Sequence, residues 1–189
     1  MTAGQSQNSM QLQRLDAAHP LFADAMALYE QSFPANERRT REDHIRALAE
    51  PDFCPMGAVE DGALLALTFY WDAPGFCYFE HFAVQPALRN SGLGGKLLDG
   101  LLQTDKPFIL EIEPPEDDLT RRRAHFYERH GLRMQPYDHV QLPFQGGGPI
   151  VPLVIMAKPD ISPAQCAEFQ QYLRAHVVPY TQYCGDWPL

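Results

Sequence analysis

The sequence has no run of apolar residues long enough to cross a membrane. A membrane-spanning helix needs about 18 to 20 consecutive apolar residues, and no stretch of this chain of 189 residues approaches that length. The start, MTAGQSQNSMQLQ, has neither the basic segment nor the apolar segment of a secretory signal. We therefore expect a cytoplasmic protein without a membrane partner.

Cysteine is scarce and has no recognisable spacing. The four cysteines are Cys54, Cys77, Cys166 and Cys184. They form no CxxC pair, and the seven histidines form no HExxH motif. Because zinc and redox sites show such spacings, we expect reduced, inert thiols and no bound metal.

Basic residues are also few compared with acidic residues. Lysine and arginine total 15 against 24 acidic residues, so the net charge is −9. Nucleic-acid binding depends on a basic face, and we therefore expect no nucleic-acid partner. Hydrophobic residues make up 45% of the chain, which is enough for the core of one folded domain.

The apolar periodicity predicts a flexible tail over residues 1–9 and a single domain over residues 10–189. Alternating patterns predict strands at 10–15, 53–60, 63–71, 76–84 and 107–113. Patterns with helical spacing predict helices at 19–33, 40–50, 94–104 and 117–131. A last pair of strands flanks Gly146–Gly148, and a C-terminal helix with an aromatic tail begins near Ser162. This order predicts a mixed α/β (α+β) domain.

A glycine-rich turn, RNSGLGGK, opens the helix at 94–104. The dinucleotide pattern G-x-G-x-x-G fails because position 97 is leucine, and the P-loop pattern fails at Asn90 and again at Leu97. Successive glycines at a helix N-terminus still leave backbone N–H groups free to bind a phosphate. The residues alone leave two alternatives open, a phosphate site or a tight turn without a ligand.

Two segments together resemble the Gcn5-related N-acetyltransferases. VQPALRNSGLGGKLL, from Val84, is similar to motif A of that family, with Arg89, Gly92 and Gly94 at its matching positions. AHFYERHGL, from Ala124, is similar to motif B. The resemblance covers about residues 10–158. It implies a mixed central sheet of about seven strands, flanked by helices, in which strands 4 and 5 splay apart.

The resemblance also implies a site for acetyl-CoA between the strands at 76–84 and 107–113. Backbone groups of Phe82 to Val84 would pair with the pantetheine, and amides from Arg89 to Gly95 would hold the pyrophosphate. Pro114-Pro115 departs from the family, in which many members place an asparagine there. The expected cofactor-binding residues are Phe82, Ala83, Val84, Arg89, Asn90, Ser91, Gly92, Leu93, Gly94, Gly95, Lys96, Phe126 and Tyr127.

Two side chains are the expected catalytic groups. The resemblance implies that the Tyr127 hydroxyl protonates the leaving CoA sulfur. Glu80 is the expected base, acting directly or through a water, because burial would raise the pKa of its carboxyl; a structural glutamate is the alternative. Strand alternation puts His81 on the opposite face. It puts five residues on one face: Phe76, Tyr78, Glu80, Phe82 and Val84.

The acceptor substrate is expected to meet a second group of residues. In relatives the segment between the first two helices forms the acceptor pocket, so Glu37, with Arg38 and Arg39, is expected to contact the substrate, unless these are solvated loop charges. Glu111 and Glu113 share one face of their strand and either line the acceptor side or face water. His139 is expected to be structural or at the surface. The tentative substrate-binding residues are Phe33, Glu37, Tyr78, Glu111 and Glu113.

These observations favour an acetyl-CoA-dependent N-acetyltransferase that acts directly on a primary amine of a small molecule or peptide. One alternative is a catalytically weak acyl-CoA-binding or sensing module with the same fold. Another is an acyltransferase with a different acyl donor or an oxygen acceptor. The sequence does not identify the acceptor amine, and a homodimer is the default oligomeric expectation.

Overall fold

The computed structural model describes residues 9–186 and residue 188. Apart from residue 9, the tail expected at 1–9 lies outside this part of the chain. The main sheet has seven strands in the order β1-β2-β3-β4-β5-β9-β6, which confirms the expected mixed α/β fold. The strands are β1 (Gln11–Arg14), β2 (Phe53–Glu60), β3 (Ala63–Asp72), β4 (Cys77–Val84), β5 (Phe108–Ile112), β6 (Arg133–Met134) and β9 (Val154–Lys158).

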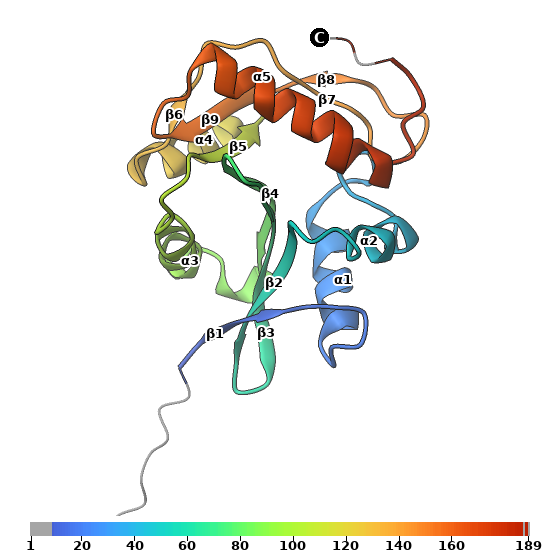
Figure 1. The fold of residues 1–189 in the computed structure, drawn as a ribbon. Helices are drawn as coiled ribbons and strands as arrows, with labels where there is room; N and C mark the ends of the chain where they lie inside the picture. The colour runs from blue at the N-terminus through green and yellow to red at the C-terminus, as the bar shows by residue number, and fades with distance from the viewer. Residues whose placement is uncertain (1–8, 187, 189) are drawn as a thin grey trace, which may run out of the picture.

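Helices cover both faces of the sheet, as Figure 1 shows for α1 and α3. One face packs against α1 (Phe22–Ser32), α2 (Arg41–Ala47) and α5 (Pro163–Tyr172), with the π-helical turn Leu173–Val177 and the 3₁₀ turn Val178–Tyr180 that follow α5. The other face packs against α3 (Leu93–Leu101) and α4 (Asp118–Arg129). We call these the α1 face and the α3 face. Short 3₁₀ turns also occur at Ala35–Glu37 and Pro86–Leu88.

Local sequence signals set several of these boundaries. The Thr40 hydroxyl caps α2 by accepting a hydrogen bond from the Asp43 amide, and Ser162 caps α5 in the same way. Asp61 and Gly62 both have positive φ angles, 50° and 75°, as a tight hairpin between β2 and β3 requires. The helix starts expected at residue 40 and near Ser162, and the break expected between the strands at 53–60 and 63–71, are confirmed.

The expected last pair of strands is wrong in one respect. Only β7 (Val140–Gln141) and β8 (Val151–Pro152) pair with each other, as a separate two-stranded ribbon. The chain then enters β9, which joins the main sheet between β5 and β6. Pro152 has no N–H to extend the ribbon, whereas the apolar residues of β9 are buried in the main sheet. No pattern predicted β6, because two residues are too few to show alternation.

The parallel strands β4 and β5 separate along their length. They pair from Cys77–Phe108 to Phe79–Leu110 and no further, although β4 continues to Val84 and β5 to Ile112. The edge of β4 that faces β5 is therefore free of strand pairing beyond Phe79. This separation agrees with the expected splay of the two strands.

The described residues contain neither a membrane-spanning helix nor a cluster of metal-binding side chains. None of their helices combines the length and the hydropathy needed to span a membrane. Within the same residues, no group of three or more His, Cys, Asp or Glu side chains is placed to hold a metal ion. All four cysteines are free, and burial raises the pKa of the Cys77 thiol to about 12.

We propose that residues 10–189 form a single cooperative domain that includes α5. Phe169 of α5 is fully buried, with its ring 5.5 Å from Phe76 and 5.1 Å from Tyr78. Phe169→Ala should therefore lower the free energy of unfolding by about 3–5 kcal/mol, as measured by urea denaturation. Leu119→Ala, at a position that is 66% exposed, should change it by less than about 0.5 kcal/mol. An unchanged main transition in Phe169→Ala would make α5 a separate unit.

Candidate active site

A β-bulge interrupts β4 where it begins to leave β5. In the pairing with β3, Phe69 lies opposite His81 and Tyr70 lies opposite Phe79, so Glu80 is an extra residue without a partner. A bulge of this kind shifts side-chain alternation by one residue.

The bulge corrects the expected division of β4 into two faces. Tyr78 lies on the α1 face and so does Ala83 beyond the bulge, whereas Phe82 and Val84 pack on the α3 face beside Leu97. The prediction that Phe76 through Val84 share one face at every second residue is therefore wrong. His81 lies on the same side as Glu80, since its Nδ1 is 3.5 Å from the Glu80 carboxylate; the prediction of opposite faces is also wrong.

Glu80 lies in a buried ion pair on the α1 face. The two terminal guanidinium nitrogens of Arg39, Nη1 and Nη2, donate to its carboxylate at 2.7 and 2.8 Å, and the Trp71 Nε1–H donates at 3.1 Å. The side chains of Arg39 and Glu80 are 0% and 1% exposed. Arg39 therefore contacts the core, so neither alternative expected for it, a substrate contact or a solvated loop charge, is correct.

This environment makes Glu80 a poor proton acceptor. Burial by itself raises the pKa of the carboxyl, but the Arg39 guanidinium and His81 outweigh it and hold that pKa well below its usual range. The expected raised pKa is therefore wrong. The missing signal was the partner: a carboxylate in an apolar strand suggests a base until Arg39, which is 41 residues away in sequence, is placed beside it.

The glycine-rich turn leads directly into α3. Gly92 is the N-cap residue with a φ of 85°, in the left-handed region that favours glycine, and no side chain caps the helix. Ser91 accepts from the Leu93 amide through its hydroxyl at 3.3 Å. The amides of Gly94 and Gly95 follow in the first turn, where a helix has no acceptor of its own for them.

The turn packs against the part of β4 that has separated from β5. A Cβ on Gly94 would lie 3.5 Å from the Phe82 ring and 3.6 Å from Val84. Arg89 donates through Nε to the Val84 carbonyl at 3.3 Å. Asn90, at a φ of 63°, and Lys96 are exposed nearby. The structure thus brings the expected residues from Phe82 to Lys96 together.

Helix α4 completes this side of the site. Tyr127 and Phe82 pack against the same buried cluster of the α3 face, and burial raises the pKa of the Tyr127 phenol to about 12. The Phe126 ring lies 5.2 Å from Tyr127 and 5.0 Å from His130. His130 in turn lies against Gly95, where a Cβ would come within 3.2 Å of the ring.

These residues fit an extended ligand that carries a pyrophosphate. Free amides at the positive end of a helix suit phosphate oxygens. A Cβ at Gly95 would crowd His130 where α4 approaches the turn. The unpaired edge of β4 supplies backbone donors and acceptors in line with the turn.

The first part of the acceptor group surrounds His81 on the α1 face. Phe33 lies 4.8 Å from the His81 ring, and the His81 Nε2–H donates to the Glu37 carbonyl at 2.7 Å. Burial, and then the neighbouring Glu113 carboxylate, raise the pKa of the Glu37 carboxyl. Glu113 forms an ion pair with Arg123, and both side chains are more than 40% exposed.

The second part of the acceptor group lies around Glu111 on β5. Tyr78 donates to Glu111 at 2.6 Å, and a short hydrogen bond joins His139 to the same carboxylate. Phe144 connects the two parts, since its ring lies 5.5 Å from His81 and it lines a small cavity with Tyr78 and Glu111. The sequence patterns missed His139 and Phe144, because both come from irregular chain beside the β7–β8 ribbon.

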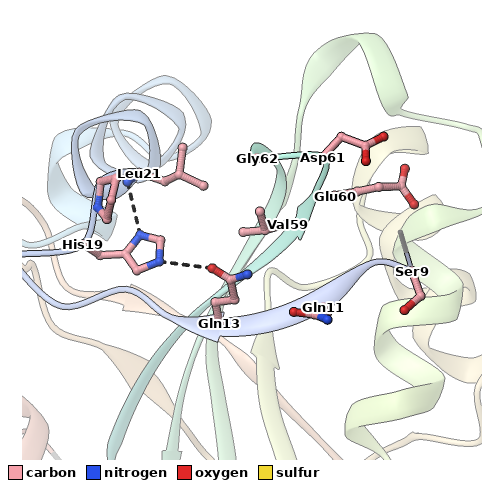
Figure 2. A pocket seen from close by; sticks show the side chains of 10 residues that line it. Ser9, Gln11, Gln13, His19, Leu21, Val59, Glu60, Asp61 and Gly62 are labelled. Atoms are coloured by element: carbon pink, nitrogen blue, oxygen red, sulfur yellow. Dashed lines mark hydrogen bonds between the residues drawn. The ribbon is translucent and has the colours of Figure 1, made fainter. Parts of the chain in front are cut away.

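A larger cavity, of about 280 Å³, lies elsewhere, beside β1. Figure 2 shows His19 and Gln13 joined by a hydrogen bond on one side and Glu60 and Asp61 on the other. It is lined by residues of β1, the chain before α1 and the β2–β3 hairpin. Neither the glycine turn nor α4 contributes to it, so it is separate from the opening between β4 and β5.

Comparison with known proteins agrees with this geometry. A model of the acetyltransferase (GNAT) family matches residues 19–132. "Putative acetyltransferase YjbC" of Bacillus subtilis (strain 168) is 39% identical over 103 residues, which are 53% of this chain and 52% of that protein. The chain therefore belongs to the acetyltransferase (GNAT) family. It spans about half the length of this curated relative.

Solved structures show the same fold. A "Putative acetyltransferase from GNAT family" of Bacteroides thetaiotaomicron is 27% identical, with a TM-score of 0.79 over 88% of this chain and 98% of that chain. A GNAT family acetyltransferase of Elizabethkingia anophelis, solved with acetyl-CoA bound, is 14% identical, with a TM-score of 0.53 over 80% of this chain and 97% of that chain. The second likeness concerns the fold alone.

We expect Glu80 to contribute to the free energy of unfolding through its ion pair with Arg39. Glu80→Gln leaves the Arg39 charge buried without its partner, so the free energy of unfolding should fall by about 3–5 kcal/mol. The double variant Arg39→Met/Glu80→Leu should cost less than Glu80→Gln. Glu113→Gln, which alters a half-exposed pair, should cost no more than about 1 kcal/mol. Urea denaturation at pH 7 measures all three.

The pH dependence of stability gives the check on this assignment. Because the folded-state pKa of Glu80 lies below its usual value of about 4.3, its contribution is complete above that pH and is lost as the pH falls. Glu80→Gln should lack this part of the acid destabilisation. A wild-type stability in Glu80→Gln would show that the carboxylate does not hold Arg39.

Proposed function

We propose that this protein transfers the acetyl group of acetyl-CoA directly to a primary amine of a small molecule or peptide. The observation that carries the proposal is the separation of β4 and β5 beyond Phe79–Leu110, with the glycine turn and Tyr127 beside the opening. The Elizabethkingia protein of the same fold was solved with acetyl-CoA, which supports an acyl-CoA as the donor.

The glycine turn, Arg89 and the free edge of β4 would together hold the acetyl-CoA donor. The amides of Gly94 and Gly95 bind the pyrophosphate at the positive end of α3, and Arg89 adds a charge-assisted contact. Beyond Phe79 the free edge of β4 binds the pantetheine arm through backbone hydrogen bonds. When bound, acetyl-CoA supplies an activated thioester.

Two side chains would act as the proton donor and the proton acceptor. Tyr127 keeps its phenolic proton throughout the neutral range, because burial raises its pKa to about 12, and it protonates the leaving sulfur. Glu37 replaces Glu80 as the proton acceptor. Its pKa is raised, mainly by burial, which makes it a better base than the ion-paired Glu80. The rate should therefore fall at low pH, as Glu37 becomes protonated.

Calorimetric titration with acetyl-CoA tests the donor site, with NAD and ATP as control ligands. Of these three ligands, only acetyl-CoA should bind to the wild-type protein. Gly92→Ala places a Cβ on a residue with a φ of 85° and should weaken binding about tenfold, or about 1.4 kcal/mol, by displacing the amides that follow. Gly100→Ala, in the same helix with open space around it, should leave binding unchanged. Equal affinity in both variants would argue against a phosphate site at the turn.

Release of free thiol in the presence of amines tests transfer itself. Tyr127→Phe should keep its affinity for acetyl-CoA and lose about 10²–10⁴-fold in kcat, since only the proton donor is removed. Tyr183→Phe, in the C-terminal tail where the hydroxyl donates to the Asp186 carbonyl, is the matched control and should retain full activity.

Full turnover in Tyr127→Phe would remove this residue from the mechanism. Tight binding of acetyl-CoA without thiol release from any amine would favour a sensing module over an enzyme.

A further inference from the structure

Glu111 occupies the point at which β4 and β5 separate. It follows Leu110, the last residue of β5 that pairs with β4. Its side chain lies on the α1 face, because it bonds to Tyr78 and His139 there. The glycine turn and Tyr127 lie on the α3 face. Glu111 therefore lies next to the opening, on the face of the sheet opposite the proposed donor site.

Two buried donors hold the Glu111 carboxylate in place. The Tyr78 hydroxyl donates to one oxygen at 2.6 Å, and the His139 Nε2–H donates to the other, since an ionised carboxylate only accepts. Tyr78 is 3% exposed, and burial, followed by Glu111 itself, raises the pKa of its phenol well above the usual value, so it stays a donor. The His139 side chain is fully buried, and its ring packs 5.7 Å from Phe169.

The cavity beside this carboxylate is narrow and mostly apolar. Its volume is about 30 Å³, which is room for one or two water-sized groups. Its apolar walls include Leu142, Phe144, Leu173 and Val177, all at most 6% exposed. Because Phe144 also contacts His81, the cavity borders the bulge in β4.

This combination of groups selects for one kind of ligand. A carboxylate in an apolar cavity is costly unless a cation or further donors meet its remaining lone pairs. An ammonium group supplies both the charge and the N–H donors. The apolar walls favour a methylene group next to the ammonium, and the small volume, which holds one or two such groups, excludes branching next to the nitrogen.

We propose that the acceptor is a primary amine on a slim, unbranched apolar stem, whose ammonium group binds Glu111 in this cavity. Tyr78 and His139 are positioning residues for that carboxylate. The inference rests on the proposed function and names its acceptor class. Glu37, on the same face, remains the group that removes the proton.

Two amines with the same number of atoms separate this acceptor class from others. With wild-type protein, n-butylamine should give a KM at least tenfold below that of tert-butylamine in the thiol-release assay. Glu111→Gln should raise the KM for n-butylamine 10- to 100-fold and leave the KM for acetyl-CoA unchanged. Glu60→Gln, an exposed change at the end of β2, is the control and should alter neither constant.

Variants of His139 test the positioning role. His139→Phe removes the donor and should raise the KM for n-butylamine about tenfold at nearly constant kcat. His139→Gln can still donate to Glu111 and should recover part of this loss. A purely structural role predicts instead a fall in active enzyme, with kcat lowered and both KM values unchanged.

Binding of n-butylamine without acetyl-CoA, followed by ligand-observed NMR, gives a readout that does not need turnover. Wild-type protein should bind it and Glu111→Gln should not. Binding that depends on Glu111 without any transfer would overturn the proposed function and keep this inference. Transfer to amines with no dependence on Glu111, or equal KM values for the two butylamines, would overturn the inference and keep the function.

Discussion

The buried ion pair between Arg39 and Glu80 is the contact on which the acceptor side of the molecule depends. It ties the loop between α1 and α2 to the bulge in β4 through two short hydrogen bonds. The same guanidinium lies over the ring of Phe144, 5.1 Å from its centroid, so it also supports the loop that joins β7 to β8. Such a pair is stable only when both partners are present, and it thereby fixes three parts of the chain at once.

That constraint helps to position the two halves of the proposed site. The α3 face contributes the N-terminus of α3 and Tyr127 of α4, so both come from two successive helices. The α1 face contributes Glu37, Glu111 and His139, which come from a loop, a strand and irregular chain far apart in sequence. In the proposal the two halves meet where β4 and β5 stop pairing, beyond Phe79–Leu110.

Patterns within short segments predicted the first half well and the second half poorly. The turn at 89–96, the strands on either side of the gap and the caps at Thr40 and Ser162 all depend on neighbouring residues, and the structure has them. The pKa expected for Glu80 is wrong because its partner Arg39 lies 41 residues away, and the faces expected for β4 are wrong because alternation along a strand contains no sign of a bulge. The hydrogen bond from His139 to Glu111 joins residues 28 positions apart, and no local pattern predicts it.

The sequence by itself determined the mixed α/β fold, the glycine-led start of α3 and the placement of Tyr127 on α4. These follow from local spacing, since a turn, a cap or a helical face needs only residues within a few positions of each other. The tertiary structure alone decided which carboxylates are free to act. Glu80 is neutralised by Arg39, Glu37 carries a raised pKa, and Glu111 is held between Tyr78 and His139. Charge and burial at a site depend on what packs around it, and that is set by contacts between distant parts of the chain.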